Sequence, residues 1–458
     1  MQDETETRPA DTGEQGASRL ARPVGEALAA ADGARARALT EGLAAPDLAD
    51  LIELIDREHR VPLIEALGAA FPYEVLSELD ETVRDELLRE LPKEMLARAV
   101  ADLESDDAAY ILESLDEADK RAILDMLPAG DRAALERNLE YPEDTAGRLM
   151  QTDFVAVPPF WTVGQVIDYM RETEDLPDTF SDIYVVDPSH HVVGGVDLSR
   201  LLRTKREVPV EKIMDPDRQV VLATADQEAV ARQFERYDLK SAPVVDADRR
   251  LVGVVTVDDV VEVIQEEAEE DLRRLSGVGD ETVTDNVIYA VRNRFLWLFI
   301  NLGTALLASS VIKLFDATID QMVALAVLMP IVASMGGNAA TQTMTVAVRA
   351  LATQELGPVN AARVILRETY VGLINGVVFA GIVGLVVLAW FGIGTLGMVI
   401  ALAMVCNFLA AALAGILIPL VLDRAGFDPA VASGVFVTMV TDVVGFFAFL
   451  GLAWLWLI

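Results

Sequence analysis

The stretch SGVFVTMVTDVVGFF, residues 433–447, places one carboxylate, Asp442, inside a long apolar run near the end of the chain. A charged side chain at the centre of a membrane helix costs about 2.5–3.5 kcal/mol on insertion scales, so it persists mainly where it faces water or other protein groups. Gly434, Thr438 and Asp442 are spaced four residues apart and share one face of a helix. The stretch therefore predicts a membrane helix with a stripe of small or polar groups along a path.

Acidic and basic residues are unevenly distributed along the 458-residue chain. Residues 292–458 contain seven basic and seven acidic residues, so the formal net charge of −36 arises within residues 1–291. This balance argues against nucleic acid as a partner, because phosphate binding needs basic clusters. Carboxylates are natural ligands of divalent cations. The acidity also fits a salt-adapted surface, because only six of the 37 basic residues are lysine, and the two interpretations are compatible.

The sequence contains no motif of a common enzyme class. Walker A, GxSxG and HExxH motifs are absent, and His59, His190 and His191 lack the spacing of metal ligands. The single cysteine, Cys406, excludes a disulfide framework or a Cys-based zinc site within one chain. The first 25 residues are polar and acidic, without the apolar segment of a signal peptide. We therefore expect a protein that is not an enzyme.

Five apolar segments follow Arg292, each long enough to cross about 30 Å of hydrocarbon. They cover residues 293–314, 322–346, 369–391, 395–421 and 431–458. Basic residues gather before the first segment and in the loops after the second and the fourth, which predicts a cytoplasmic N-terminal region and a C-terminus outside. The third segment has small residues every four positions, which predicts close helix packing: Gly372, Gly376, Ala380 and Gly384.

The region before the membrane segments divides into four parts. Residues 1–25 are predicted to be a disordered acidic tail. Residues 26–145 carry leucines at three- and four-residue spacing between prolines, which predicts an all-α superhelical domain. Residues 146–209 and 210–265 form an internal repeat, in which IYVVDPSHHVVGGVDLSRLL (183–202) aligns with SAPVVDADRRLVGVVTVDDVV (241–261). Residues 266–291 are predicted to continue as a connecting helix.

The repeat resembles a tandem pair of CBS domains, an α/β module that typically binds or senses adenine nucleotides. In such units an acid in a Ser/Thr-x-x-Asp step often fixes the ribose. The second unit has this step as Thr256 and Asp259, whereas the first reads Asp197, Leu198, Ser199, Arg200. The resemblance implies ATP as a candidate ligand, with Thr256 and Asp259 as its candidate contacts.

Four stretches look like signatures of the MgtE family of magnesium channels or transporters: YPEDTAGRLM (141–150), PIVASMGGNAATQT (330–343), CNFLAAALAGILIPL (406–420) and DPAVASGVFVTMVTDVVGF (428–446). The order of the parts also matches. The resemblance implies a multidomain membrane protein with a cytoplasmic all-α superhelical domain, a tandem α/β CBS pair, a connecting (plug) helix and a five-helix transmembrane domain over residues 292–458. It further implies a homodimer with a central pore, in which Asp442 selects the ion and Gly434, Thr438 and Asn338 line the path.

The resemblance also implies that cytoplasmic acidic residues bind Mg²⁺ and hold the pore shut. The candidates are Asp106, Asp107, Asp259, Glu262, Glu267, Glu270, Asp271 and Asp428. Clustered carboxylates repel one another and divalent ions bridge them, so loss of the ions would let the domains separate. Three positions depart from the family pattern: Ala340 stands in place of a glycine, Val435 of a proline, and Tyr110 of an acid.

We therefore expect a Mg²⁺-selective homodimeric channel or transporter of the cell membrane, gated by cytoplasmic Mg²⁺, with Mg²⁺ and the lipid bilayer as its partners. Two further hypotheses stay open. One is a divalent cation exchanger or a Co²⁺-permeable carrier, and the other is a membrane-anchored CBS sensor that conducts nothing. Flux without a counter-ion gradient separates a channel from an exchanger, and loss of transport on Asp442→Ala separates either from a sensor.

Overall fold

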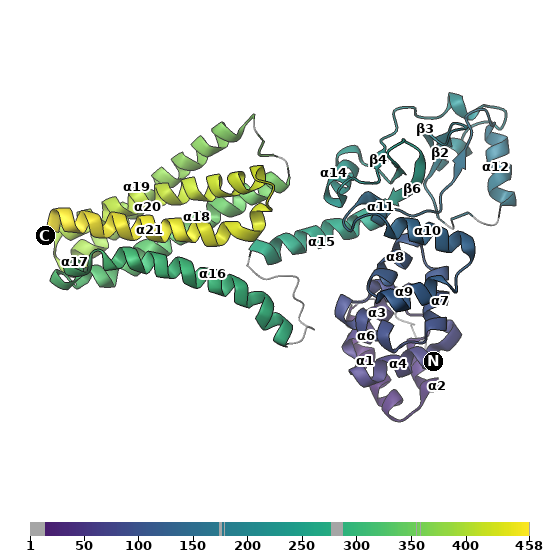
Figure 1. The fold of residues 1–458 in the computed structure, drawn as a ribbon, viewed down its shortest axis with the longest axis horizontal. Coiled ribbons are helices and arrows are strands. Elements are labelled where there is room, and N and C mark those ends of the chain that lie inside the picture. The colour runs from purple at the N-terminus through teal and green to yellow at the C-terminus, as the bar shows by residue number, and fades with distance from the viewer. Residues whose placement is uncertain are drawn as a thin grey trace, which may run out of the picture. The chain divides into compact units, whose positions relative to one another are not determined.

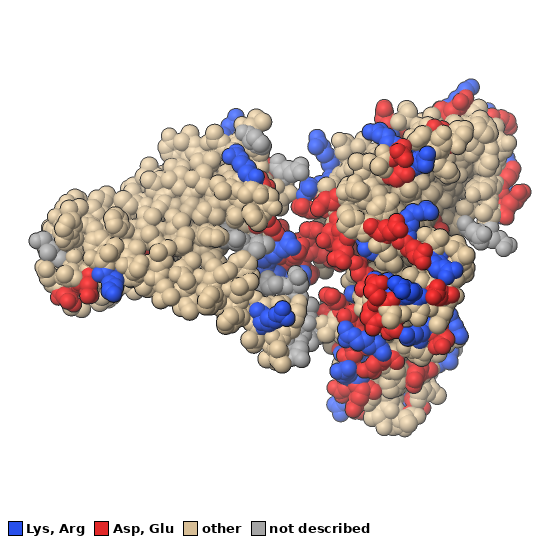
Figure 2. Space-filling view, viewed as in Figure 1, with Lys and Arg blue, Asp and Glu red and all other residues tan. Residues whose placement is uncertain are grey.

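The computed structural model describes residues 14–173, 176–177, 179–275, 287–353, 355–357 and 359–457. The chain forms two compact units, of which the first ends at Glu267 and the second begins at Ala268 (Figure 1). Charged side chains, many of them acidic, are frequent on the face of the first unit in Figure 2, whereas the second unit shows few in the same view. The charge segregation expected from the sequence is confirmed.

The first unit begins with a region of short amphipathic helices. Leucines at three- and four-residue spacing point into one core, which includes the fully buried Leu51, Leu63 and Ile111. Pro92 and Pro128 directly precede two of the helices, where a missing N–H costs little. The helices are α1 (Glu14–Ala29), α2 (Gly33–Thr40), α3 (Ala45–Leu54), α4 (Arg57–Leu67), η1 (Gly68–Ala70), α5 (Val75–Glu78), α6 (Glu81–Glu90), α7 (Lys93–Asp102), α8 (Ser105–Glu113), α9 (Glu117–Leu124) and α10 (Ala129–Leu139).

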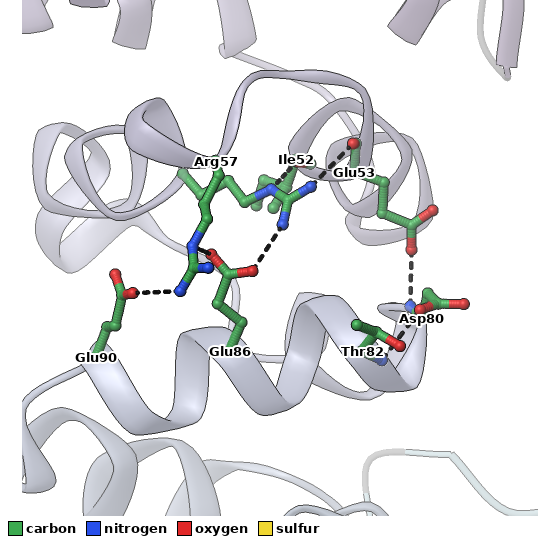
Figure 3. Close-up of polar contacts among 8 residues, drawn as sticks. Ile52, Glu53, Arg57, Asp80, Thr82, Glu86 and Glu90 are labelled. Atoms are coloured by element: carbon green, nitrogen blue, oxygen red, sulfur yellow. Dashed lines mark hydrogen bonds and ion pairs between the residues drawn. The ribbon is translucent and has the colours of Figure 1, made fainter. Parts of the chain in front are cut away.

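Polar contacts around Glu86 join three of these helices (Figure 3). The Glu86 carboxylate on α6 pairs with Arg57 and with Arg60 of α4, the latter at 3.3 Å. Arg60 also donates to the backbone carbonyls of Ile52 and Glu53 in α3, at 3.1 and 3.3 Å. One arginine therefore satisfies the open C-terminal carbonyls of α3 and the carboxylate of α6 at once, which fixes the stacking of the three helices.

The predicted disordered tail over residues 1–25 is wrong for its second half. α1 begins at Glu14, and Ala17, Val24 and Ala27 on this helix are fully buried. These small apolar residues lie among arginines and acids, so the stretch looks polar by composition although one helical face packs against the core. Residues 1–13 lie outside the described residues.

The internal repeat is confirmed, because each half folds as a three-stranded sheet of the same topology. The sheets contain β1 (Ala156–Val157), β2 (Asp182–Val186) and β3 (Val192–Asp197), then β4 (Val221–Leu222), β5 (Ser241–Val245) and β6 (Leu251–Thr256). In both sheets the first strand pairs parallel with the second, and the second pairs antiparallel with the third. The associated helices are α11 (Ala146–Leu149), α12 (Val163–Glu172), α13 (Leu198–Leu202), η2 (Val210–Lys212) and α14 (Gln227–Tyr237).

The helix α15 (Val257–Leu275) begins directly after β6 and continues past the end of the first unit, as the connecting-helix prediction required. Its residues Val260 and Val263 pack into the core of the second repeat. The prediction extended the connecting helix to residue 291. Residues 276–286 of that range lie outside the described residues, and residues 287–291 instead belong to the next helix, α16 (Val287–Lys313). α16 begins at Val287, before the predicted apolar segment at residue 293, because Arg292 and Arg294 do not interrupt helical hydrogen bonding.

The described part of the second unit contains five helices long and apolar enough to cross a membrane. The five predicted segments are confirmed. The helices are α16, α18 (Ala324–Ala352), α19 (Ala361–Phe391), α20 (Gly394–Arg424) and α21 (Pro429–Leu457), with the short α17 (Asp316–Gln321) between the first two.

α20 provides much of the core of the second unit, where Ala403, Met404 and Ala411 are fully buried. The small residues of α19 face it, as predicted from their spacing. A Cβ atom at Gly372 would lie 2.5 Å from the Cβ of Ala412 on α20, which is too close for any larger residue. This close approach sets the spacing of the two helices.

Candidate cation sites

The first unit contains a cavity of about 510 Å³ that is lined largely by acidic side chains. We call it the acidic cavity. It brings together four residues predicted from the sequence: Asp106 and Asp107 of α8, and Asp259 and Glu262 of α15. The other acids and the two arginines that line it are Glu81, Arg84, Asp85, Glu113, Glu143, Asp144, Arg148 and Glu266.

Two helix starts position the central carboxylates of the acidic cavity. α8 begins at Ser105, whose Oγ accepts a hydrogen bond from the Thr152 backbone N–H at 2.7 Å, so this helix end is tied to the repeat. α15 begins after Thr256, whose backbone N–H and Oγ1 donate to Asp259 Oδ2 at 3.2 and 2.5 Å. Asp107 and Asp259 therefore lie in the first turns of two helices, where the helix dipole favours negative charge.

Burial makes the charged forms of these carboxylates costly. Burial, followed by the charges of nearby carboxylates, raises the pKa of Asp107 to about 6 and the pKa of Glu262 to about 7. Burial also raises the pKa of Asp106 and of Asp259 above its ordinary range. A divalent cation in the acidic cavity would supply the missing positive charge and stabilise the ionised forms.

The carboxylates of the acidic cavity do not form a compact metal site. Among the residues that the structure describes, no three His, Cys, Asp or Glu side chains are grouped closely enough to hold a metal ion directly. The Oδ1 atoms of Asp85 and Asp106 are buried without a hydrogen-bond partner. A cation that keeps part of its hydration shell, as Mg²⁺ does, can satisfy separated oxygens through its bound water.

Sequence reasoning missed Glu104, which lies beside this group. Its Oε2 accepts a hydrogen bond from Gln151 Nε2 at 2.6 Å, and the same nitrogen lies 3.5 Å from Asp259 Oδ2. Burial and then the charge of Asp259 raise the pKa of Glu104 to about 7. The available signal was its position, because Glu104 opens the run ESDD that contains Asp106 and Asp107.

The predicted nucleotide contacts, Thr256 and Asp259, line two different cavities. Thr256 lines a second cavity of about 310 Å³ together with Phe180, Tyr184 and Lys240. Asp259 lines the acidic cavity instead, although Thr256 donates to its carboxylate. Aromatic rings and a lysine are groups that can contact a nucleotide base and a phosphate. The second cavity therefore has groups that can contact a base and a phosphate, but it lacks the expected Asp259 and is also lined by four acids, Glu104, Asp153, Asp182 and Asp258.

The remaining predicted sensor acids lie elsewhere. Glu267 accepts a hydrogen bond from Gln227 Nε2 at 2.9 Å, and Gln227 lines the acidic cavity. In the second unit, Glu270 and Asp428 pair with the same guanidinium, that of Arg274, which lies 2.5 Å from Asp428 Oδ2. Asp428 Oδ1 also accepts from the backbone N–H at the second residue of α21 at 2.7 Å. Asp271 lies on α15 beside Glu270.

The predicted stripe on α21 is present in one continuous helix. Thr438 Oγ1 donates to the Gly434 carbonyl at 2.9 Å, so its hydroxyl is used within the stripe. Asp442 is half-buried, and within the described part of the chain its carboxylate has neither a hydrogen bond nor an ion pair. A carboxylate without a protein partner on a membrane helix needs water, a cation or another chain to stabilise its charge.

Asn338, the fourth predicted pore residue, is exposed on α18. It lines a groove of about 320 Å³ whose lining residues come from α18, α19 and α20. The groove also contains Gln342 of α18 and Asn375 of α19, which are exposed. Exposed amides on helices of this apolar type are costly against lipid, which indicates that this face is covered by water or protein.

Comparison with protein families gives three matches along the chain. Residues 329–452 match the MgtE family, described as divalent cation transporters. Residues 43–144 match the MgtE intracellular N domain. Residues 146–207 and 210–266 each match the CBS domain.

Individual relatives are similar over most of the chain. The magnesium transporter MgtE of Enterococcus faecalis is 36% identical over 69% of this chain and 70% of its own length. The magnesium transporter MgtE of Thermus thermophilus is 35% identical over 70% of this chain and 72% of its own length. A crystal structure of the cytosolic domain of the Mg²⁺ channel MgtE in complex with ATP is 36% identical, with a TM-score of 0.50 over 53% of this chain and all of that one.

Proposed function

We propose that the chain, which belongs to the MgtE family of magnesium transporters, forms a homodimeric Mg²⁺-selective channel of the cell membrane. Mg²⁺ bound in the acidic cavity closes this channel. The observation that carries the proposal is Asp442. Its carboxylate has no polar partner in the described part of the chain, although it lies on a helix apolar enough to span a membrane. A hydrated cation passing beside it would supply the charge that this site lacks.

A homodimer supports this path by simple charge arithmetic. One carboxylate per chain balances only half of a divalent ion, whereas a two-fold axis beside α21 would bring two copies of Asp442 to the same ion. Thr438 and Gly434 would then continue the path along the helix, and Asn338 on α18 would contribute an amide. The distribution of arginines supports an orientation with the soluble domains in the cytoplasm and the C-terminus outside.

The acidic cavity supplies the gate. Without cations its carboxylates are costly to ionise, as the raised pKa values of Asp107 and Glu262 indicate. Mg²⁺ binding would stabilise the arrangement in which α8 and the start of α15 face one another, and its loss would favour an arrangement with the carboxylates farther apart. α15 leaves this cavity and continues into the second unit, so a change at its start has a covalent route to the membrane helices.

Transport by proteoliposomes tests the proposal. Asp442→Asn keeps the size of the side chain and removes its charge, so we expect loss of Mg²⁺ uptake measured with a trapped fluorescent indicator. Asp423→Asn is the matched control, because Asp423 is an exposed acid near the end of α20. Normal uptake by Asp442→Asn would contradict the role of Asp442 in the path, whereas absence of uptake by the unmodified chain would favour the non-conducting sensor.

Flux in the same proteoliposomes distinguishes a channel from an exchanger and from a Co²⁺-permeable carrier. Uptake driven by a Mg²⁺ gradient alone, without a counter-ion gradient, is expected of a channel and contradicts an exchanger. Uptake of Co²⁺ itself into the same proteoliposomes would indicate a Co²⁺-permeable carrier. Raising Mg²⁺ on the side of the soluble domains should reduce the flux, whereas an unchanged flux would contradict gating by the acidic cavity.

ATP is the second ligand that we propose, at the cavity lined by Thr256, Tyr184 and Lys240. A 36% identical cytosolic domain was crystallised with ATP, and the volume of this cavity, about 310 Å³, falls at the lower end of ligand sites. We expect Lys240→Gln to weaken ATP binding measured by calorimetry. The exposed Lys212 offers a matched control as Lys212→Gln, and equal affinities in the two variants would contradict the assignment.

A further inference from the structure

Glu368 of α19 is an acid that the charge count along the sequence assigns to a loop, yet the structure buries it. Its residue surface is 6% exposed, and it lines the groove that also contains Asn338 and Gln342. Glu368 belongs to α19 (Ala361–Phe391), two turns after the helix begins. A carboxylate at this depth in a membrane helix needs a cation or a hydrogen-bonded partner to stabilise its charge.

The described part of the chain gives Glu368 only a weak partner. Arg367 Nη1 lies 3.7 Å from Glu368 Oε1, which is beyond hydrogen-bond distance. The Arg367 side chain is 70% exposed, so its guanidinium remains hydrated at the rim rather than buried with the acid. Among the residues that the structure describes, none donates a hydrogen bond to this carboxylate, which is costly for a buried charge.

Neutral oxygen donors line the same groove as this carboxylate. Asn338, Gln342 and Asn375 supply amide oxygens, and the buried Thr343 supplies a hydroxyl. The groove volume of about 320 Å³ is large enough for an ion with several water molecules. One carboxylate, neutral oxygens and room for water form the donor set that a hard divalent cation such as Mg²⁺ accepts.

We propose that Glu368 and the amides of Gln342 and Asn375 in this groove form a second binding site for a partly hydrated divalent cation in the membrane unit, separate from Asp442. The two sites differ in their helices, because the groove is lined by α18, α19 and α20 whereas Asp442 lies on α21. In the cation-free chain Arg367 provides a distant counter-charge, and it turns fully toward water when the cation enters. The proposal rests on the proposed transport of divalent cations, but occupancy of the groove can be measured without transport.

Thiol protection in the full-length chain tests the site. The native Cys406 is replaced by serine and Val371→Cys is introduced, because Val371 is exposed and lines the groove without being a proposed ligand. A water-soluble charged thiol reagent is then applied in detergent with and without Mg²⁺. We expect Mg²⁺ to slow modification severalfold in this background. No modification without Mg²⁺, or modification that Mg²⁺ does not slow, would overturn the proposal.

Charge variants assign the protection to Glu368. Glu368→Gln should abolish it, Glu368→Asp should retain part of it, and Asn375→Leu should weaken it. Glu355→Gln is the control, because Glu355 is an exposed acid in the loop before α19. Protection that survives Glu368→Gln would overturn the proposal, and size-exclusion profiles confirm that each variant is folded.

The Asp442→Asn variant separates this proposal from the proposed function. Protection should persist in Asp442→Asn, even though transport is lost there, if the groove is a site of its own. Loss of protection in Asp442→Asn would overturn a separate site. Protection together with normal transport in Asp442→Asn would instead support the groove site and contradict the proposed role of Asp442.

Discussion

The Arg84 guanidinium carbon lies 3.9 Å from the centre of the Tyr110 ring, and both residues line the acidic cavity. Arg84 is only 2% exposed, and its Nε and Nη1 atoms have no hydrogen-bond partner in the described part of the chain. The aromatic face therefore provides much of the favourable environment of this buried cation. The family resemblance predicts an acid at the position of Tyr110. The Arg84 guanidinium and the Tyr110 ring therefore occupy a place where a metal-binding carboxylate was expected.

This arrangement predicts that Tyr110→Glu strengthens Mg²⁺ binding in the acidic cavity. The new carboxylate adds negative charge, and we expect the Mg²⁺ concentration that half-protects the soluble domains from protease to fall about two- to fivefold, as for a charge contact of about 0.5–1 kcal/mol. Tyr110→Phe keeps the ring over Arg84 and is expected to change nothing. An unchanged midpoint in Tyr110→Glu would mean that Arg84 neutralises the added charge completely.

The raised pKa values predict a pH-dependent stability of the cation-free chain. Glu104, Asp107 and Glu262 have pKa values of about 7, 6 and 7 in the folded state, above those of an unfolded chain. At pH values between the pKa values of the unfolded state and those of the folded state, the folded state binds more protons than the unfolded state. The free energy of unfolding therefore falls as pH rises through about 6 to 7. We expect the melting temperature in chelator to fall between about pH 5 and about pH 8.

Variants and Mg²⁺ isolate this effect from general acid sensitivity. The triple variant Glu104→Gln, Asp107→Asn, Glu262→Gln removes the three titrating groups and should flatten the pH dependence. Mg²⁺ should raise the melting temperature of the unmodified chain more at about pH 8 than at about pH 5, because protons compete with the cation. Equal stabilisation at both pH values would argue against cation binding at these carboxylates.

The sequence predicted those features that depend on local pattern. The repeated Val-Val-Asp strand ends identified both sheets, and the family resemblance identified four acids of the acidic cavity, Asp106, Asp107, Asp259 and Glu262. The tail prediction was wrong because Ala17 contributes to a core only in the context of a packed helix face. Features that depend on two elements far apart in the sequence could not be predicted from local pattern, because the burial of a side chain depends on the helices that pack over it.

Glu368 illustrates that limit in the membrane unit. It follows Arg367 directly, and two adjacent opposite charges at the edge of an apolar segment are typical of a loop. Its burial results from α18, α19 and α20 meeting around it. The partition of Thr256 and Asp259 between two cavities has the same origin, because the helical region and the repeat each close one side of the first turn of α15.

A buried polar chain links the two repeats and predicts a stability effect. Ser241 Oγ donates to Asp182 Oδ2 at 2.6 Å and lies 2.5 Å from the Tyr184 hydroxyl, and Arg218 Nη2 lies 2.6 Å from Asp182 Oδ2. Ser241→Ala leaves the buried Tyr184 hydroxyl without its partner and removes one of the donors to Asp182, so we expect it to lower the free energy of unfolding by about 1–3 kcal/mol. Chemical denaturation measures this difference.

The exposed Ser199 of α13, in the first repeat, is the control. Ser199→Ala should change the free energy of unfolding by less than about 0.5 kcal/mol. If the two serine variants were equally stable, the polar chain would contribute nothing net and the repeats would be held by their apolar cores alone.

The Asn407 side chain determines how closely three of the membrane helices pack. This residue of α20 is 0% exposed, and its Nδ2 donates to the Val332 carbonyl of α18 at 2.9 Å. A Cβ atom at Gly336 would lie 2.1 Å from Nδ2, and one at Gly445 would lie 2.7 Å from it. Both glycines therefore leave room for one amide that joins α18, α20 and α21. Gly336 precedes Asn338 by two residues, and Gly445 follows Asp442 by three, so this contact sets the helices that carry these two predicted pore residues.

Alanine at either glycine must push the Asn407 amide away or separate the helices. We expect Gly336→Ala and Gly445→Ala each to destabilise the membrane unit by about 1–3 kcal/mol, as overpacking of a close-packed core does, and to lower Mg²⁺ uptake in the same variants. The controls are Gly337→Ala and Gly381→Ala, because a Cβ atom at either position meets nothing within 4 Å. They should be neutral or slightly stabilising, since alanine favours a helix over glycine. Melting curves in detergent and liposome flux measure both effects, and equal losses in the control pair would show that helix flexibility matters here rather than the Asn407 contact.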